Sequence, residues 1–175
     1  GAYAGYRKGF FDLALMRVVD VVYAFPGILL IVSVAAFLGP SVPNMILSLV
    51  VTGWASYARL MRAVALSVSE RDFIQSARAM GASDARIVFR HLLPNLAGPL
   101  LVNMTYGIGS VILAESALGF LGLGAPPGTP SWGQMLNSGR EVMTTASHLV
   151  LVPGCALVLT VLGFNLLGDG LRDFL

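Results

Sequence analysis

The stretch SERDFIQSARAMGASDARIVFRHLLPN, residues Ser69–Asn95, is a charged island in a sequence that is otherwise apolar. It holds seven of the 20 Asp, Glu, Lys and Arg residues of the chain, 11 basic and 9 acidic, and long uncharged segments lie on either side. Ser69 and Asp72 have the spacing of a capping box, which predicts that a helix begins there. Gly81 stands where such a helix, after about three turns, needs a residue in the left-handed conformation. The island is therefore predicted to contain a short helix that ends at a glycine corner.

This short helix is predicted to be amphipathic, because its residues separate into two faces at helical spacing. The apolar face carries Phe73, Ala77 and Met80, and the polar face carries Arg71, Gln75 and Arg78. A second helix is predicted to begin at Ser83, with Asp84 favourably placed in its first turn, and to be interrupted at Pro94. The island thus leads through a corner back into an apolar segment.

Composition places the chain among membrane proteins. Hydrophobic residues make up 56% and charged residues 11% of the sequence, against about 25% charged residues in soluble domains. The mean hydropathy is +0.79, and so few, clustered charges could not cover a soluble surface. The chain is predicted to be an all-α, polytopic membrane protein. Since Gly1 is not an initiator Met and GAYAGY is typical of the end of an earlier span, we expect that N-terminal helices are missing.

Four membrane spans are predicted from the uncharged segments. Residues 21–58 carry no charge, and as one helix they would extend about 57 Å, nearly two bilayer cores. The sequence GPSVPN at 39–44 divides this run, and Pro26-Gly27 predicts a kink before it. Later uncharged runs supply two more spans. The predicted spans are residues 20–38, 44–66, 94–118 and 149–167, and the Gly- and Pro-rich segment 119–146 is a loop with a short interfacial helix after Pro130.

The basic residues give the orientation. With four spans, the segments before the first, after the second and after the fourth lie on one side, which then carries ten Lys and Arg residues. The opposite side carries only Arg140. The charged segment 69–91 is therefore expected in the cytoplasm and the loop 119–146 outside.

No catalytic constellation is present in the sequence. Lys8 is the only Lys and lies in no phosphate-binding loop of the type Gly-x-x-x-x-Gly-Lys-[Ser/Thr]. Neither a serine elbow nor a zinc-binding His-Glu-x-x-His is present, and two separated His with the single Cys155 do not make a metal site by spacing. If ATP drives this protein, another chain hydrolyses it.

The residues alone leave two interpretations of the island equally open. A charge cluster is usually a solvated loop, but a solvated loop needs no helix with an apolar face. Phe73, Ile74, Ala77 and Met80 also suit insertion into a groove on a partner.

The same stretch resembles the EAA signature of ABC importer permeases. Ala77, Gly81, Leu93 and Pro94 match that signature at its spacing, while Gln75 replaces its opening Glu. The longer string ARAMGASDARIVFRHLLPN is similar to the dipeptide, oligopeptide and nickel branch of these permeases. Further similar segments are AESALGFLGLG at 114–124, PSWGQML at 130–136 and FNLLGDGLRD at 164–173, so that the resemblance covers essentially the whole chain.

The resemblance implies a role for each part of the chain. Segment 69–91 would contain the coupling helix, which seats on a cytoplasmic ATPase subunit. The residues implied are Glu70, Asp72, Phe73, Ile74, Gln75, Ala77, Arg78, Met80 and Gly81. Gln75 leaves the role of the opening carboxylate to Glu70 or Asp72. The implied partners are a homologous permease subunit, two ATPase subunits holding ATP and Mg²⁺, an external solute-binding protein and membrane lipid, but no nucleic acid. The substrate would be a di- or oligopeptide, or nickel, and the location a bacterial or archaeal cytoplasmic membrane.

Four polar or aromatic residues outside the island are further candidates. Glu115 within a span either lines the pathway or makes a structural hydrogen bond, with solvation close to the outer interface as a further alternative. Asn103 is a pathway residue or an interhelical hydrogen-bonder. Trp132 and Arg140 are expected to belong to an external gate or to the surface that the binding protein contacts. The alternative is that this segment anchors the chain at the membrane interface. For the whole chain, the alternative functions are an ATP-independent secondary transporter or channel, and a scaffolding subunit.

Overall fold

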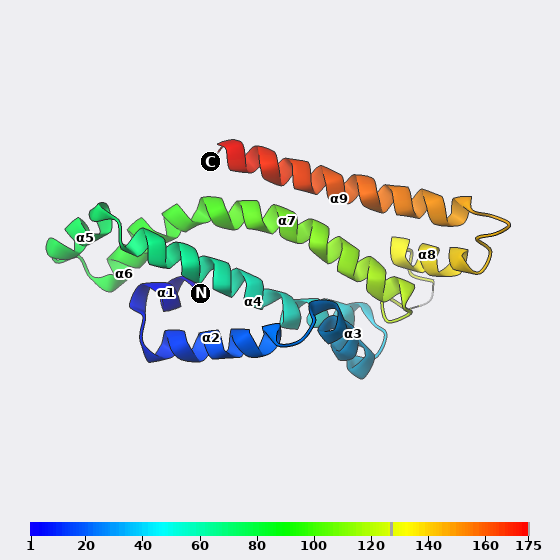
Figure 1. Ribbon diagram of the computed structural model, residues 1–175, viewed down its shortest axis with the longest axis horizontal. Helices are drawn as coiled ribbons and strands as arrows, with labels where there is room; N and C mark the ends of the chain where they lie inside the picture. The colour runs from blue at the N-terminus through cyan, green and yellow to red at the C-terminus, as the bar shows by residue number, and fades with distance from the viewer. Residues whose placement is uncertain (127, 175) are drawn as a thin grey trace. The chain divides into compact units, whose positions relative to one another are not determined.

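The computed structural model describes residues 1–126 and 128–174, and the described residues form nine α-helices and one π-helix without any strand (Figure 1). The prediction of an all-α protein is confirmed. In chain order the elements are α1 (Ala2–Arg7), α2 (Phe10–Tyr23), α3 (Gly27–Leu38), α4 (Val42–Ser69), α5 (Asp72–Ala79), α6 (Asp84–Ile87), the π-helix η1 (Val88–Leu92), α7 (Leu93–Phe120), α8 (Trp132–Arg140) and α9 (His148–Phe174).

Two helical stretches are long and apolar enough to cross a membrane, Asp84–Phe120 and His148–Phe174. They contain the predicted spans 94–118 and 149–167. The bent pair of α2 and α3 supplies a third crossing if it is counted as one span. The predicted span 44–66 lies within the continuous helix α4. This helix is long enough to cross a membrane, but it is less apolar than the two stretches above and is not counted with them. The presence of apolar spans is confirmed, and their number as four stays a prediction.

The predicted span 20–38 is not a single helix. α2 ends at Tyr23 and α3 begins at Gly27, with Pro26 at its N-cap. Proline lacks the backbone N–H and disfavours helical dihedrals in the residue before it, so Phe25 and Pro26 cannot continue α2. The break lies where Pro26-Gly27 predicts a kink.

One expected helix end is wrong. Pro94 does not interrupt its helix, because the wider turn of η1 comes directly before it and accommodates the missing N–H. Gly168-Asp169-Gly170, which follows the predicted span 149–167, lies inside α9. There Gly168 serves close packing, because a Cβ would lie 2.7 Å from the Thr105 Oγ1 atom. The Asp169 carboxylate accepts a hydrogen bond from the Tyr106 hydroxyl.

The chain divides into two compact units. The first comprises residues 1–24, 53–103 and those from Leu171 on, and the second comprises residues 25–52 and 104–170. In the first unit, α1 packs on α4 through glycines: a Cβ on Gly1 would lie 2.3 Å from the Ala58 carbonyl oxygen, and one on Gly5 2.6 Å from that of Arg62. Such contacts are typical of helices that approach closely in lipid.

α2 and α4, also in the first unit, are joined by ion pairs. The Arg62 Nε and Nη2 atoms donate to the two carboxylate oxygens of Asp12 at 2.5 and 2.6 Å. The Arg59 Nη2 atom donates to Asp20 at 2.9 Å, and its guanidinium lies 4.1 Å from the centre of the Tyr23 ring. Asp20 thus links α2 to α4.

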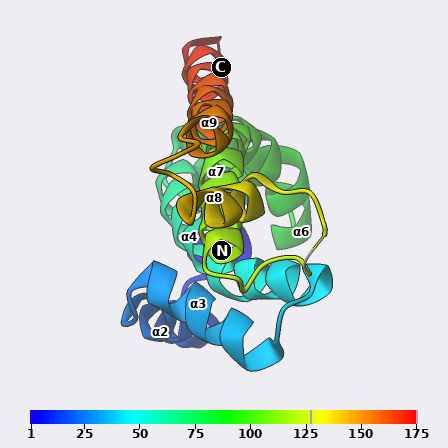
Figure 2. The ribbon, with the colours of Figure 1, turned by 90° about the vertical axis from the view of Figure 1, so that its right-hand side faces the viewer.

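In the second unit, α8 packs on the end of α7 (Figure 2). A Cβ on Gly133 would lie 2.4 Å from the Ser116 carbonyl oxygen, and a Cβ on Gly119 would lie 3.1 Å from the Gly133 Cα atom. Ala35, Met45 and Leu118 form a small buried cluster with residues of α3 and α4. The short helix expected after Pro130 is confirmed as α8, whereas residue 127 of the predicted loop lies outside the described residues.

Candidate functional site

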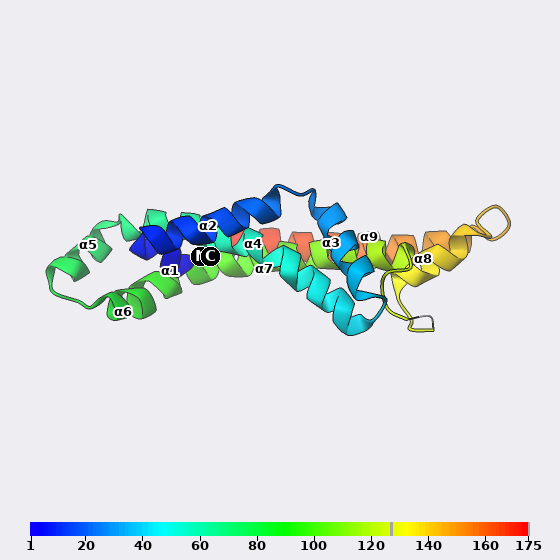
Figure 3. The same cartoon turned by 90° about the horizontal axis from the view of Figure 1, so that it is seen from below.

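The predicted coupling segment, residues 69–91, lies in the first unit between the long helices α4 and α7, and we call this segment the corner. Figure 3 shows α5 and α6 beyond the end of α4, with α1 beside them. α5 follows α4 after two residues, Gly81 makes the turn, and α6 continues through η1 into α7. The corner therefore connects directly to the helix that enters the membrane.

The predicted start of α5 is wrong by two residues. Ser69 is the last residue of α4, and its hydroxyl donates to the Ala65 carbonyl oxygen at 2.6 Å instead of capping α5. Arg71 is the N-cap of α5, without a side-chain capping bond. Serine can satisfy its hydroxyl on the preceding helical turn as well as at an N-cap, and here the buried position of Ser69 favours the former.

The predicted end of α5 is confirmed. Gly81 has a φ of 80°. The N–H of Gly81 donates to the Arg78 carbonyl at 3.0 Å, and that of Ala82 to the Ala77 carbonyl at 3.1 Å. These two bonds form a Schellman motif, which satisfies carbonyls that the end of a helix leaves free. Ser83 then begins α6, its hydroxyl accepting from the Arg86 N–H at 3.4 Å.

We expect substitutions of Gly81 to act through the backbone alone. No heavy atom lies within 4 Å of a Cβ built on Gly81, so a side chain meets no steric obstacle there. A positive φ costs an ordinary residue roughly 1–2 kcal/mol and a β-branched one more, whereas Asn tolerates it. Gly81→Asn should therefore keep the thermal midpoint of unfolding nearest to wild type and Gly81→Val should lower it most. Equal midpoints for the two variants would contradict this assignment.

The expected apolar face of α5 is only partly available to a partner. Ile74 and Ala77 are buried in the core of the first unit, together with Met61, Ala65, Val68, Ile87, Val88, Leu92 and Leu96. Met80 is 82% exposed and Phe73 39% exposed, with the Phe73 ring centre 6.5 Å from that of His91. The helical periodicity of the sequence correctly identified an apolar face. Ile74 and Ala77 on this face pack against the chain itself, whereas Phe73 and Met80 point outward.

The polar candidates of the corner make contacts within the chain. The Gln75 side-chain amide donates to the Ser69 carbonyl oxygen at 3.1 Å, which ties α5 to the end of α4. An ionised Glu has no donor for this bond, so the Gln in this position has a structural use of its own. Glu70 lies 3.6 Å from the Lys8 ammonium, and Asp72 occupies the first turn of α5, where its charge is favourable.

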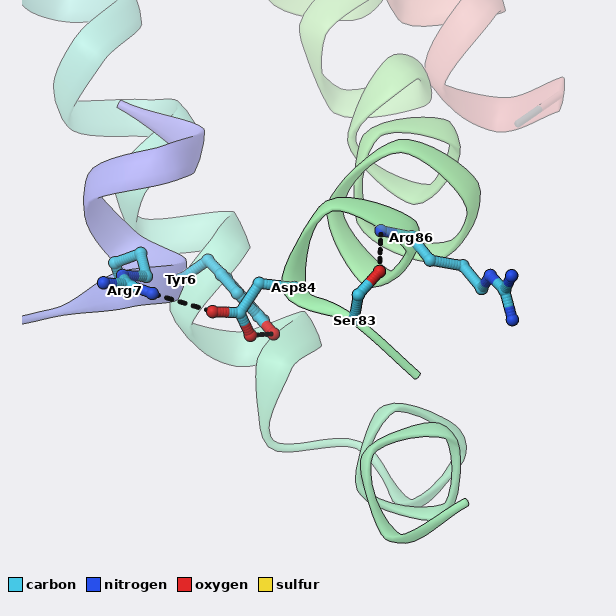
Figure 4. A network of polar contacts seen from close by, with 5 residues as sticks. All are labelled: Tyr6, Arg7, Ser83, Asp84 and Arg86. Atoms are coloured by element: carbon cyan, nitrogen blue, oxygen red, sulfur yellow. Dashed lines mark hydrogen bonds and ion pairs between the residues drawn. The ribbon is translucent and has the colours of Figure 1, made fainter. Parts of the chain in front are cut away.

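A contact between the N-terminal helix and the corner was not predicted from the sequence. The Tyr6 hydroxyl and the Arg7 Nη1 atom each donate to a different oxygen of Asp84 at 2.8 Å (Figure 4). The Arg78 guanidinium lies 5.5 Å from the centre of the Tyr6 ring. The hydrogen bonds from Tyr6 and Arg7 lower the pKa of the Asp84 carboxyl, which lies ahead of the predicted span 94–118. Asp84 is thus held ionised at neutral pH.

The remaining candidates lie apart from the corner. Asn103 and Glu115 are half-buried on α7, and the Ser116 hydroxyl lies 3.3 Å from a carboxylate oxygen of Glu115. Trp132 begins α8, which Ser131 caps by accepting from the Gln134 N–H at 3.2 Å. Arg140 ends α8, and its guanidinium lies 5.5 Å from the centre of the Phe120 ring. The pathway and docking roles of these residues stay predictions.

Comparison with known proteins gives matches along the whole chain. A family model described as "Binding-protein-dependent transport system inner membrane component" matches residues 1–175. The chain is 43% identical to the dipeptide transport system permease protein DppC of Alkalihalophilus pseudofirmus, over 100% of this chain and 58% of that protein. It is 47% identical to the glutathione transport system permease protein GsiD of Escherichia coli and of Shigella boydii, over 97% of this chain and 56% of each. The chain spans little more than half the length of these relatives.

Proposed function

Because this chain belongs to the family of binding-protein-dependent transport system inner membrane components, we propose that it is part of the membrane subunit of an ATP-driven importer. Its apolar helices agree with the inner-membrane location that the family description gives. Dependence on a binding protein argues against a channel or a scaffold, and the resemblance of residues 69–95 to the EAA signature of ABC importer permeases favours ATP-driven import over an ATP-independent carrier. The names of two relatives include dipeptide and glutathione, both short peptides, which supports short peptides as the substrate class.

The full transporter would contain partners for each side of the membrane. We propose a homologous second permease subunit beside this one, two cytoplasmic ATPase subunits that hold ATP and Mg²⁺, and an external solute-binding protein. The ten-to-one distribution of basic residues supports the cytoplasmic placement of the corner. Glu115 and Asn103 on α7 are proposed to face the pathway or to hold α7 through hydrogen bonds.

The observation that carries the coupling role is the division of α5 into a buried and an exposed side. Ile74 and Ala77 fix α5 to its own chain, and Phe73 and Met80 project beyond it. An ATPase that receives these two side chains would therefore move the whole corner with it. Such movement can drive alternating access only if nucleotide binding favours one conformation of the transporter over the other.

Phe73→Asp should weaken association with the ATPase at least tenfold while leaving the corner folded. Full burial of a Phe contributes about 1.5–3 kcal/mol, and a partner can bury only the 39% of Phe73 that is exposed, which corresponds to roughly 0.6–1.2 kcal/mol. A buried unpaired carboxylate costs about 1–3 kcal/mol more, and each 1.4 kcal/mol is a factor of ten in affinity. The measurement is co-purification of the ATPase subunits together with substrate-stimulated ATP hydrolysis. Ala85→Asp adds the same charge at an exposed position of α6 and should change neither.

A thermal-unfolding measurement separates docking from folding in this experiment. Ile74→Asp places a carboxylate in the core and should lower the midpoint of the permease itself, because Ile74 is fully buried. Phe73→Asp should leave that midpoint near wild type. If Phe73→Asp retains the ATPase and the stimulation unchanged, the ATPase docks elsewhere.

We further propose that α8 contributes to the external gate or to the footprint of the binding protein. Trp132 and Arg140 lie at its two ends, and Met135 between them is exposed. Trp132→Ala combined with Arg140→Ala should reduce stimulation of ATP hydrolysis by the binding protein several-fold, because Trp and Arg are frequent interface anchors. Basal hydrolysis and membrane insertion should persist, and Ser138→Ala on the same helix serves as the control. Lost insertion with normal stimulation per assembled complex would indicate a membrane anchor instead.

A further inference from the structure

The helix that leads from the corner into the membrane has one face that no described residue covers. Along α6, η1 and the start of α7, the inward positions Ile87, Val88, Leu92 and Leu96 are buried in the first unit. The outward positions alternate with them and are exposed: Arg86, Phe89, Arg90 and Leu93. Phe89 is 72% exposed and lies between the two arginines, so this face combines an apolar surface with two positive charges.

The two arginines of this face lack a carboxylate partner among the described residues, whereas most other basic residues of the same unit have one. Ion pairs with carboxylates occupy Arg7, Lys8, Arg17, Arg59 and Arg62. Among the described residues, Arg86 and Arg90 take part in no ion pair. Figure 4 shows the Arg86 guanidinium extending away from Asp84, Tyr6 and Arg7, although Asp84 is only two residues distant. Two free cations, four residues apart, therefore point outward on one side of the helix.

The position of this face along the helix corresponds to the lipid headgroups. The helix continues from Asp84 to Phe120, and its charge-free part begins after His91. At about 1.5 Å per residue, Arg90 lies about 6 Å and Arg86 about 12 Å before Pro94, where the predicted span begins. The headgroup layer is about 5–8 Å thick on each side of the hydrocarbon, so the Arg90 backbone lies within it and the Arg86 backbone lies about 4–7 Å outside it, on the aqueous side. Long arginine side chains extend toward the phosphates from such depths, and an aromatic residue between them suits the interface.

We propose that Arg86 and Arg90, with Phe89 between them, bind the headgroups of anionic phospholipids in the cytoplasmic leaflet. Guanidinium groups donate two parallel hydrogen bonds to a phosphate, and basic residues beside a span are attracted to an anionic leaflet. Leu93 continues the same face into the hydrocarbon. The proposal depends on the membrane location of the chain and its orientation, and not on docking of an ATPase at Phe73 and Met80.

The test measures which lipids the full-length permease retains. The permease complex is placed in nanodiscs that contain phosphatidylglycerol and phosphatidylcholine, and the bound lipids are counted by native mass spectrometry. Each Arg near an anionic surface contributes roughly a fivefold preference. Arg86→Gln with Arg90→Gln should therefore lower the preference for phosphatidylglycerol by about 25-fold, while Arg86→Lys with Arg90→Lys retains most of it. Arg71→Gln removes another exposed arginine, outside this face, and should have no effect.

Three results would overturn the proposal. The first is an unchanged lipid preference in the double Gln variant that still co-purifies its partners. The second is an equal loss of preference in Arg71→Gln, which would mean that only the total charge matters. The third is loss of the ATPase subunits with an unchanged lipid preference, which would assign this face to the ATPase. A double Gln variant that does not assemble is replaced by the single variants, for which about a fivefold loss each is expected.

Discussion

Gly5→Leu should abolish assembly of the permease, because it leaves no room between α1 and α4. A Cβ on Gly5 would lie 2.6 Å from the Arg62 carbonyl oxygen, 3.1 Å from the Ala65 Cβ atom and 3.2 Å from the Arg62 Cα atom. Two of these atoms are backbone, which cannot rotate away as a side chain can. Overpacking of this kind costs about 1–3 kcal/mol when the structure can shift, and more when backbone atoms must separate.

The separation would also remove the contacts that α1 makes with the corner. Tyr6 is buried and donates to Asp84, and Arg7 follows it on the same helix. We therefore expect a combined loss of about 3 kcal/mol or more, which lowers the folded-to-unfolded ratio at least a hundredfold. The yield of assembled complex in fluorescence-detected gel filtration and its thermal midpoint measure the effect.

Gly53→Leu is the matched control for Gly5→Leu. Gly53 lies on α4, and no heavy atom lies within 4 Å of a Cβ built on it. The same substitution there should preserve the midpoint, since a Gly in the interior of a helix is itself unfavourable. Gly5→Ala should already be harmful, because the clash involves the Cβ atom. If Gly5→Leu and Gly53→Leu prove equally stable, α1 does not pack on α4 in this way.

Arg62→Met should destabilise the first unit by about 2–4 kcal/mol. It would leave the Asp12 carboxylate, which is 6% exposed, without the guanidinium that now donates two hydrogen bonds to it. Removing one partner from a buried ion pair costs about 3–5 kcal/mol, and the 33% exposure of the Arg62 side chain reduces this. The thermal midpoint and the urea dependence of unfolding give the measured value.

The double variant decides whether the loss comes from the unpaired charge. Asp12→Leu with Arg62→Met replaces the pair by apolar side chains and should recover most of the stability, because a buried pair contributes little beyond an apolar contact. The double-mutant cycle then gives a coupling energy of at least about 1 kcal/mol. Additive effects of the two single variants would contradict the pairing.

Local features were predictable where the chain itself supplies the physical cause. The left-handed residue at Gly81 and the cap at Ser83 each depend on neighbours within four residues, and both are confirmed. Ser69 has two local ways to satisfy its hydroxyl, and the sequence does not say which one burial favours. Pro94 is similar, because the π-helix that accommodates it has no known sequence signal.

Long-range features were predictable only in part. Periodicity identified an apolar side of α5, but it could not show that Ile74 and Ala77 pack inside the chain while Phe73 projects from it. The contact of Tyr6 and Arg7 with Asp84 joins residues 77 and 78 positions apart, and no local pattern indicates it. Composition and resemblance gave the fold class and family, whereas the contacts of the candidate site required the structure.

The separation of α5 into two sides has an evolutionary consequence. Residues that keep the corner folded, such as Ile74, are different from the two that a partner would touch, Phe73 and Met80. If the ATPase docks there as proposed, mutations at the outward pair would alter which ATPase is recruited without first lowering stability. Duplicated transporters of this design could diverge in their ATPases, or continue to share one, through changes at two surface positions. The inward residues, by contrast, would have to vary together, because each contacts the same core.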